Sequence, residues 1–355
     1  MKNIFYIFLI LVVINTLTCC NYGPTVNKPM ETEINNGMEI RSITLKYLLL
    51  DTLYEIYQAN VLCPEKYQEY YSSENEIEKR HYEWLIKTYD LFTYQNKLEL
   101  KNIFENIHVW KLLNISTLTA DNSNIDDLIV LIKSSSGISK ETKTSLLNLM
   151  PVFYDEFFKE YFQGNIEYYN TKTDKFNDNL ADYPNPFEII EKETGMNLGK
   201  YSSLFYFTFR KVGAYGFTHG NLKISTIQGN ITEVEHIMST ALHEFSHSFF
   251  QKFTDDAGFK DLSERLKSVK EFYEYWEKNS SLKSSYSWNA FCEENLVEGF
   301  AKFLGEKFYD IKGRRETYIY DADFYEYLKE IGYSPDKYNF KETSINFYEK
   351  RILGN

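Results

Sequence analysis

The 355-residue chain has few cysteines and a deficit of basic residues, and these shortages exclude two classes of protein. Four cysteines cannot build a dense disulfide scaffold, and a chain with 43% hydrophobic residues can bury a core without one. Lys and Arg number 39 against 51 Asp and Glu, so the net charge is −12 and the pI is near 5.2. Nucleic-acid readers need a positive surface, so no nucleic-acid partner is expected. No internal repeat of solenoid length is evident either.

Long hydrophobic runs are also scarce. The apolar run over residues 4–14 follows a lysine and is shorter than the ~20 residues of a transmembrane helix, which indicates an export segment. Leu17 stands three residues before Cys20, as in the lipobox of bacterial lipoproteins, where the cysteine becomes the lipidated N-terminus. We therefore expect residues 1–20 to be a lipoprotein signal peptide with Cys20 as the lipidation site. Cys19, or a plain signal peptide cut elsewhere, is the alternative.

Lipidation would place the mature chain on the bacterial cell envelope or surface, with the membrane as a partner through the N-terminal lipid anchor. Residues 21–40 contain two prolines, two glycines and several asparagines without apolar periodicity, which is typical of a flexible tether. Only Cys63 and Cys292 would remain after processing. The sequence leaves open whether they form a disulfide or stay free.

Two regions of different pattern follow the tether. Over residues 41–198 apolar residues recur with a period near 3.6, which predicts a helical N-terminal region. The segments 203–209 and 222–227 predict short strands of a small sheet, expected to be antiparallel. The remainder of residues 199–355 is predicted to be mainly helical. The expected fold class is therefore α+β, mainly helical, with the sheet directly before the helix that carries the motif described next.

That helix has a recognisable start, because Thr232 and Glu235 fit a capping box in which both side chains satisfy free backbone N–H groups. It is expected to run to about Phe253. Other helices are predicted over 125–133, 144–162, 187–192, 262–278 and 288–309. The last 45 residues give only weak helical signals.

Residues 243–247 of that helix read His-Glu-Phe-Ser-His, an HExxH motif. Helical residues four apart lie one turn apart on the same face, so His243 and His247 can both reach one tetrahedral Zn²⁺. Glu244 then lies beside a water on the metal, where it can take a proton and pass it to a leaving amine. The motif predicts one Zn²⁺ per chain.

A catalytic zinc usually has a third protein ligand and one open position. The long form HExxHxxGxxH does not fit, because Phe250 and Phe253 stand where its glycine and last histidine should be. An aspartate ligand would be Asp255 or Asp256, just after the helix.

A glutamate ligand has better support. Glu294 and Glu298 lie one turn apart on a helix that is otherwise rich in apolar residues. One can bind the metal while the other accepts a hydrogen bond from a ligand imidazole. Glu293 is a competitor for the third position.

This combination resembles the gluzincin metallopeptidases, which join HExxH to a downstream Glu on a second helix, often followed four residues later by an acidic residue. HEFSHSF with the later Glu-x-x-Val is also similar to a group of uncharacterised bacterial exported zincins known only as a domain of unknown function. The similarity is specific over about residues 232–305 and implies a zincin-like catalytic region at 199–355 acting on a peptide or protein. The implied roles are ligands His243, His247 and Glu294, general base Glu244, and imidazole-orienting Glu298.

Two departures from the gluzincin pattern stand out. The interval from His247 to Glu294 is 47 residues, so an inserted helix must fold between the two ligand helices. The acidic partner is Glu298, where Asp is commoner.

Other functions and residues stay open at the level of sequence. The chain could be a surface lipoprotein that binds ligands with a degenerate or structural metal site, or a zinc amidase acting on cell-wall material. No residue that would stabilise an oxyanion is identified. The remaining histidines are interpreted as loop or structural residues: His81, His108, His219 and His236.

Overall fold

The structure is a computed structural model that describes residues 37–71, 76–180, 182–199, 201–279, 282–283, 286–312 and 316–354. The expected signal peptide, Cys20 and residues 21–36 of the expected tether lie outside the described residues. No helix within the described ranges has the length and apolar character needed to cross a bilayer.

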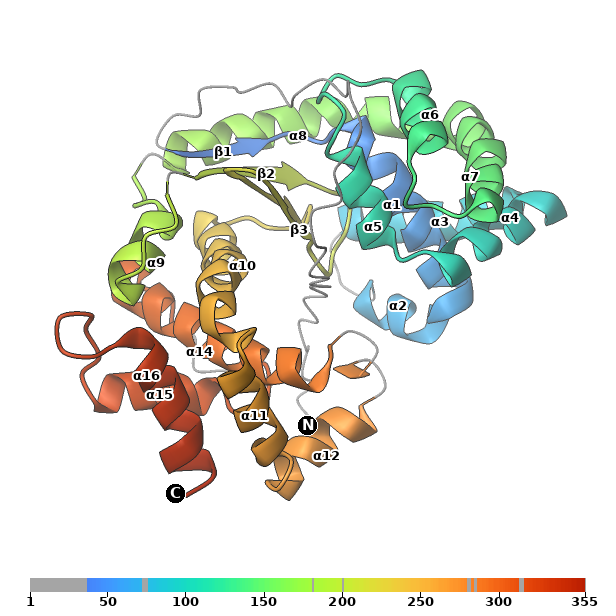
Figure 1. Ribbon diagram of the computed structural model, residues 1–355. Coiled ribbons are helices and arrows are strands. Elements are labelled where there is room, and N and C mark those ends of the chain that lie inside the picture. Colours follow the sequence, from blue (N-terminus) through green and yellow to red (C-terminus); the bar gives the residue numbers. More distant parts are fainter. Residues whose placement is uncertain are drawn as a thin grey trace, which may run out of the picture.

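Helices form most of the described chain (Figure 1). They are α1 (Leu45–Tyr57), α2 (Pro64–Tyr70), α3 (Glu76–Leu91), α4 (Tyr94–Asn106), α5 (Val109–Ser116), α6 (Ile125–Ser134), α7 (Lys140–Phe153), α8 (Lys159–Leu180), α9 (Pro186–Thr194), α10 (Val234–Thr254), α11 (Ala257–Leu266), α12 (Lys270–Lys278), α14 (Trp288–Tyr309), α15 (Asp321–Glu330) and α16 (Phe340–Asn346). Three π-helical segments adjoin them, over Gln58–Leu62, Tyr154–Phe158 and Phe347–Ile352.

The sheet is mixed, with the order β1-β2-β4-β3. Its strands are β1 (Met38–Arg41), β2 (Ser202–Phe207), β3 (Gly216–His219) and β4 (Leu222–Ile227). β1 pairs in parallel with β2, β2 pairs in parallel with β4, and only β3 and β4 are antiparallel. The expectation of an antiparallel sheet is therefore wrong for β2 and β4. The chain turns at Gly220, at φ +56°, so that β3 and β4 form an antiparallel hairpin. β4 then runs alongside β2 in the same direction, which makes that pair parallel.

The strand β1 begins inside the segment expected to be a tether, so that expectation is wrong for residues 38–40. Met38 and Ile40 are buried while the residues next to them are partly exposed, which is the period-two pattern of a strand with one covered face. The described fold therefore uses this segment as part of its sheet, although the partner strand β2 lies about 160 residues later.

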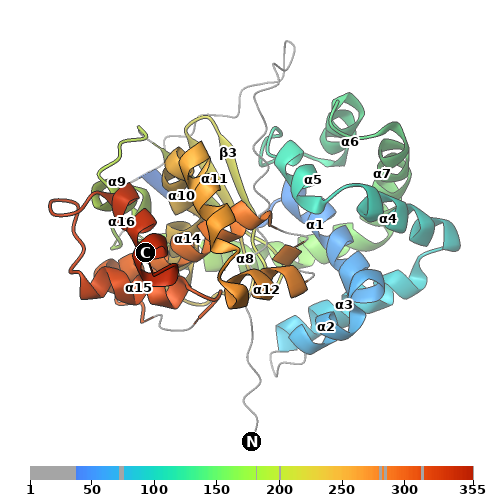
Figure 2. The same ribbon diagram turned by 60° about the horizontal axis from the view of Figure 1, so that its bottom comes forward.

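The sheet is covered by α8 on one face and by α10 on the other, and α14 packs on the far side of α10 (Figure 1). Gly299 of α14 permits a close approach to the next helix, because a Cβ there would lie 2.5 Å from the carbonyl oxygen of Asp321. Figure 2 shows helices α1 to α7 grouped in one half of the molecule, and helices α9 to α12 and α14 to α16 in the other. We call the first group the N-terminal helical lobe.

The helix α1 is the centre of the N-terminal helical lobe. All thirteen of its residues are buried, as expected of a helix that is apolar around most of its circumference. Its buried charges are paired, since Asp51 accepts from Arg210 at 2.6 Å and Glu55 contacts His81 at 3.2 Å. The lobe therefore has its own core next to the sheet, in which these buried charges form ion pairs.

Several helix predictions are confirmed, most closely those for α6, α9, α10 and α14. The predicted helix over 262–278 is instead two helices, α11 and α12. The predicted capping box is also wrong, because the N-cap of α10 is Glu233 and makes no side-chain cap bond. Glu235 is held instead by the hydroxyl of Tyr183, which removes it from the capping position.

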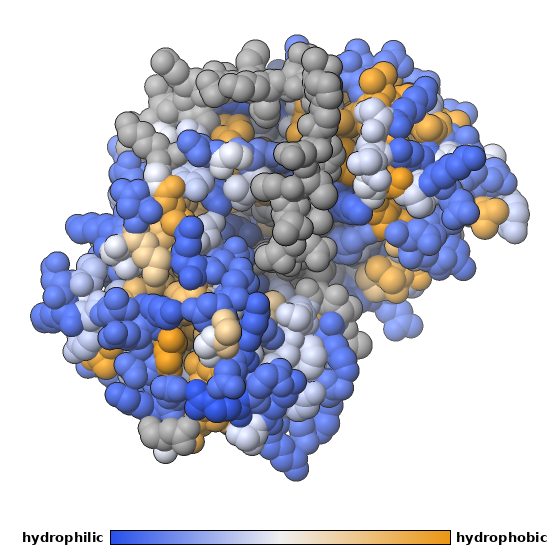
Figure 3. Space-filling view, in the orientation of Figure 1, coloured by the Kyte–Doolittle hydropathy of each residue, from blue (hydrophilic) through white to orange (hydrophobic). Residues whose placement is uncertain are grey.

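The face of the molecule in Figure 3 is mainly hydrophilic, with smaller hydrophobic patches over both halves of the molecule. This agrees with the acidic composition of the chain. Cys63 and Cys292 are both free thiols, the first partly exposed and the second buried in α14. They do not form the disulfide that the sequence left open.

Candidate metal centre

The candidate centre lies between α10 and α14, which pack against each other (Figure 1). Both helices are largely buried, so their few polar side chains must find partners in the space between them. The interval between the two ligand helices contains α11 and α12, where sequence reasoning expected one inserted helix.

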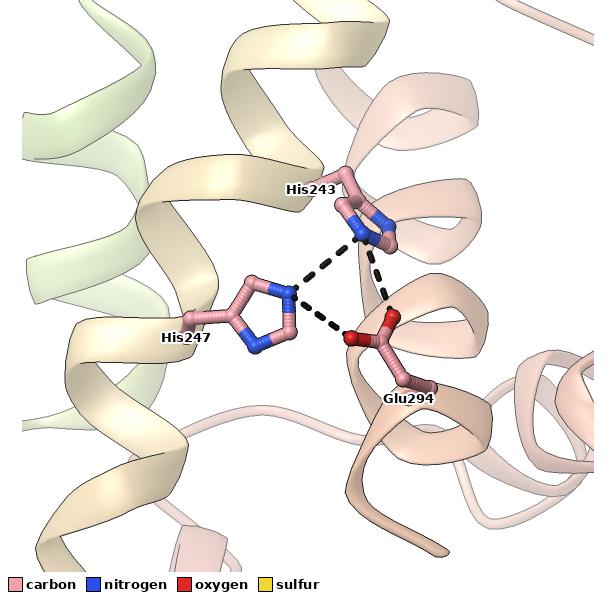
Figure 4. Close-up of side chains that lie close together, drawn as sticks. All are labelled: His243, His247 and Glu294. Carbon is pink, nitrogen blue, oxygen red and sulfur yellow. Dashed lines mark hydrogen bonds and ion pairs between the residues drawn. The ribbon is translucent and has the colours of Figure 1, made fainter. Parts of the chain in front are cut away.

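His243 and His247 of α10 and Glu294 of α14 point toward one another (Figure 4). The two histidine Nε2 atoms lie 3.4 Å apart. Glu294 Oε2 lies 3.4 Å from His243 Nε2, and Glu294 Oε1 lies 3.6 Å from His247 Nε2. All three residues are buried, and they form the one cluster among the described residues that could hold a metal ion.

These distances fit a tetrahedral ion. Ligand atoms bound at about 2.0–2.1 Å in a tetrahedron lie about 3.3–3.4 Å from one another. The three separations in the cluster, 3.4, 3.4 and 3.6 Å, are close to that value. Two imidazoles and one carboxylate are also a donor set typical of catalytic zinc sites.

Each histidine has its own carboxylate on α14. His243 Nδ1 donates to Glu298 at 2.8 Å, and His247 Nδ1 donates to Glu293 at 2.9 Å. A proton held on Nδ1 leaves the Nε2 lone pair free to face the centre between the helices. Glu293 lies on the far side of the His247 ring from Nε2, where it can orient that imidazole, whereas the Glu294 carboxylate faces both Nε2 atoms.

Further side chains hold these carboxylates. Glu293 accepts a hydrogen bond from the hydroxyl of Thr254. Glu298 accepts from Thr317 at 2.9 Å, and Lys302 lies 3.5 Å from it. Tyr318 donates to Glu294 at 3.3 Å. The centre is therefore built from three elements: α10, α14 and the turn before α15.

The turn before α15 is fixed by one buried carboxylate. Asp321 accepts from the backbone N–H of Thr317 at 3.0 Å and from that of Tyr318 at 3.1 Å. Its side chain also accepts from Lys302. This arrangement presents the Thr317 and Tyr318 hydroxyls to the two glutamates of α14.

The protonation preferences of the site follow from these contacts. Burial alone would lower the pKa of His243, but hydrogen bonds with Glu294 and Glu298 raise it well above its ordinary value. Burial would likewise lower the pKa of His247, and the charge of Glu294 with the hydrogen bond to Glu293 raises it. Without a metal, these carboxylates therefore make each imidazole bind a proton more readily than a free histidine does.

Glu244 differs from the other glutamates of the site. It is partly exposed, but its Oε1 atom is buried and has no hydrogen-bond partner. Burial raises the pKa of its carboxyl, against the attraction of the two histidines. Glu244 Oε1 is therefore free to accept a hydrogen bond from a water or from a substrate group.

Gly216 of β3 makes room for Glu244. A Cβ at this position would lie 2.7 Å from Glu244 Oε2, so any side chain would displace the carboxylate. The carbonyl oxygen of Gly216 accepts from Trp110 Nε1 at 3.0 Å, which joins α5 of the N-terminal helical lobe to the edge strand. Glu244 thus lies where the sheet, α10 and this lobe come together.

The other candidates from the sequence lie elsewhere. Asp256 caps α11 and pairs with Lys341 at 2.8 Å, and Asp255 is exposed, so neither joins the histidines. His219 contacts Thr117, and His236 is exposed on the first turn of α10. His81 is buried against Glu55, while His108 caps α5. None of these four histidines reaches the candidate centre.

Sequence reasoning missed Thr254, Thr317, Tyr318 and the role of Glu293. The four-residue spacing of Glu298 and Lys302 could have indicated their contact. Nothing in the local sequence marks Tyr318 or Gly216, since their contacts with α14 and α10 span 24 and 28 residues of chain.

A scan against protein-family models and searches of curated proteins and solved structures found no match for this chain. The case for a function therefore depends on the motif and on the geometry of the candidate centre.

Proposed function

We propose that this protein is a zinc-dependent peptidase of the gluzincin type, with His243, His247 and Glu294 as ligands. The convergence of these three side chains at separations suited to a tetrahedral ion is the observation that carries the proposal. When bound, Zn²⁺ would polarise a carbonyl group and lower the pKa of a water toward ~7.

The residues around the centre would transfer the proton and hold the ligands in place. Glu244 accepts a proton from the attacking water and returns it to the leaving amine, for which its raised pKa and unpartnered Oε1 suit it. Glu298 and Glu293 hold the two imidazoles with Nε2 toward the centre. Tyr318 fixes the orientation of Glu294.

The test of the base is Glu244→Gln, which removes the proton acceptor and keeps the shape of the side chain. The purified variant should bind about one Zn²⁺ per chain by metal analysis and lose hydrolysis of a broad peptide library by at least 100-fold. Wild-type activity in the variant would refute the assignment of Glu244 as the base. A zinc-loaded wild type that cleaves no peptide would instead favour a ligand-binding lipoprotein, and cleavage of muropeptides alone would favour an amidase.

The test of the third ligand uses a matched pair on α14. Glu294→Ala should reduce bound zinc well below one per chain, because two imidazoles alone hold the ion weakly. Glu293→Gln keeps an acceptor for His247 and should retain zinc with about 10–100-fold lower affinity. The reverse order of the two variants would assign the ligand to Glu293.

The proposed location is the bacterial cell envelope or surface, through a lipid on Cys20. Labelling cells with a clickable palmitate analogue should mark the wild-type chain, while Cys20→Ala should abolish the label. Retention of label in Cys20→Ala with loss in Cys19→Ala would move the site to Cys19.

A further inference from the structure

A buried lysine lies close to the proposed base without an acidic partner. Lys223 of β4 donates to the hydroxyl of Thr218 at 3.1 Å and to that of Ser248, and its Nζ lies 5.3 Å from the centre of the Tyr201 ring. The residue is only 7% exposed. No carboxylate in the described part of the chain forms an ion pair with it.

An unpaired buried cation is costly. Burial lowers the pKa of Lys223 to about 8, and no neighbouring charge opposes this shift. Lys46 is the one other buried lysine among the described residues, and it is paired with Asp121 at 2.6 Å. Buried charges in proteins are normally paired, so the site of Lys223 lacks a negative group.

The register of the β3–β4 hairpin places this lysine relative to Glu244. Gly216 pairs with Ser225 and leaves room for the Glu244 carboxylate, while Thr218 pairs with Lys223, which contacts Ser248. Glu244 and Ser248 are one helical turn apart, a rise of about 6 Å, and the matching step of two strand residues is about 7 Å. Along the axis of α10, Lys223 therefore lies about 6–7 Å from Glu244, on the same side of that helix.

The residues around Lys223 on this side of α10 keep some exposure to solvent. Thr218 is exposed, and Ser248, Gly216 and Glu244 are partly exposed. A step of 6–7 Å corresponds to about two residues of an extended peptide. A group next to Glu244 and a group next to Lys223 can thus belong to one short peptide.

We propose that Lys223 binds a carboxylate of the substrate, about two residues from the bond that is cleaved. This inference depends on the proposed peptidase function and adds a substrate class, peptides with a negative group near the cleaved bond. The carboxylate can be the free C-terminus of a peptide or an acidic side chain, and Lys223 supplies a charge-assisted hydrogen bond to either.

A kinetic comparison tests the subsite and separates the two sources. The zinc-loaded enzyme is assayed on matched peptides that differ only in a free or amidated C-terminus, and on amidated peptides that carry Asp or Asn near the cleaved bond. Peptides with the recognised carboxylate should show a kcat/KM about 10–100-fold above their neutral partners. Equal kcat/KM values for all pairs would overturn the subsite and leave the peptidase proposal intact.

Two variants assign the effect to one side chain. Lys223→Met should remove the preference for the carboxylate peptides and leave kcat/KM for the neutral ones within about threefold. Lys172→Met is the matched control, because Lys172 also has a pKa lowered by burial to about 8 but lies in α8, on the opposite face of the sheet. If Lys223→Met keeps the preference, or Lys172→Met loses it equally, the assignment to Lys223 is wrong.

A binding measurement keeps the inference testable without turnover. The zinc-loaded Glu244→Gln protein is titrated with the dipeptide Ala-Ala and its amide, and with Ala-Asp-Ala amide and Ala-Asn-Ala amide, by calorimetry. At least one carboxylate probe should bind about 10–100-fold more tightly than its neutral partner, and the added Lys223→Met change should abolish that ratio. A ratio near one, or a ratio insensitive to Lys223→Met, would refute the inference whether or not the protein is a peptidase.

Discussion

The hydrogen bond between Glu298 and His243 offers the most quantitative check on the centre. Burial alone would raise the pKa of Glu298, but the hydrogen bond and charge of His243, with Lys302 and Thr317, lower it to about 2. The ordinary value is 4.5, so the ionised carboxylate is favoured in the fold by about 2.5 pKa units. Each unit corresponds to about 1.4 kcal/mol, which gives an upper bound of roughly 3 kcal/mol.

The perturbation is Glu298→Gln in the metal-free protein. The amide oxygen can still accept from His243 Nδ1, so only the charged part of the interaction is lost. The free energy of unfolding at pH 7 should fall by about 1–3 kcal/mol. The zinc affinity should also fall about 10–100-fold, since the amide orients and polarises His243 less strongly.

The assay is urea unfolding of wild type and variant in the presence of a chelator, followed by circular dichroism. Because the folded pKa is lowered, this stabilisation is fully present above pH 4.5 and is lost as the pH falls through about 2. The difference between wild type and variant should therefore shrink as the pH is lowered from 4.5 toward 2.

Glu306→Gln is the matched control for this measurement. Glu306 lies on the same helix and pairs with Lys329 at 2.9 Å, but both side chains are 34% exposed. An ion pair that accessible contributes at most about 1 kcal/mol. If Glu298→Gln and Glu306→Gln cost the same, or neither changes zinc affinity, the account of Glu298 as a charged support of His243 is refuted.

Three further outcomes are expected. Zinc binding should release protons, because contacts raise the pKa values of His243 and His247. Calorimetry in two buffers should detect the released protons, and the Kd for zinc should rise up to tenfold per proton for each unit by which the pH falls. Zero proton release would contradict this. Gly216→Ala should lower kcat/KM at least tenfold with zinc content unchanged, because its Cβ would displace Glu244, the proposed base. Gly164→Ala, where an added Cβ would meet nothing within 4 Å, should leave activity unchanged. Burial lowers the pKa of Lys223 to about 8, so at pH 7 its charged form destabilises the fold. Lys223→Met should therefore raise the free energy of unfolding at pH 7 by up to roughly 3 kcal/mol. A clear loss of stability would indicate a structural role for Lys223 instead.

The sequence predicted the two ligand helices well, and physical reasons explain why. α10 and α14 are long, apolar and periodic, and α14 was predicted with its observed bounds. The spacing within HExxH places His243 and His247 on one face without any tertiary information. The pairing of Glu294 with Glu298 at one-turn spacing then indicated which glutamate faces them.

The sheet and the supports of the centre were beyond local patterns. β1 and β3 have four residues each, too few for a period of two to stand out, and the partner of β1 lies far along the chain. The role of Glu293 depends on which side of the His247 ring it reaches, which spacing on α14 alone does not determine. The sequence around Lys223 shows only a strand residue, because its contact with Ser248 depends on the register of the β3–β4 hairpin.

The paired imidazoles between α10 and α14 have a consequence for how a metal would enter. Contacts with the carboxylates of α14 raise the pKa values of both imidazoles, so protons compete with an entering ion for the Nε2 lone pairs. The Nε2 atoms and the Glu294 carboxylate already lie at separations close to those of a tetrahedral ion, so α10 and α14 could keep the same packing before and after loading. Zinc uptake by this protein should therefore weaken as the pH falls.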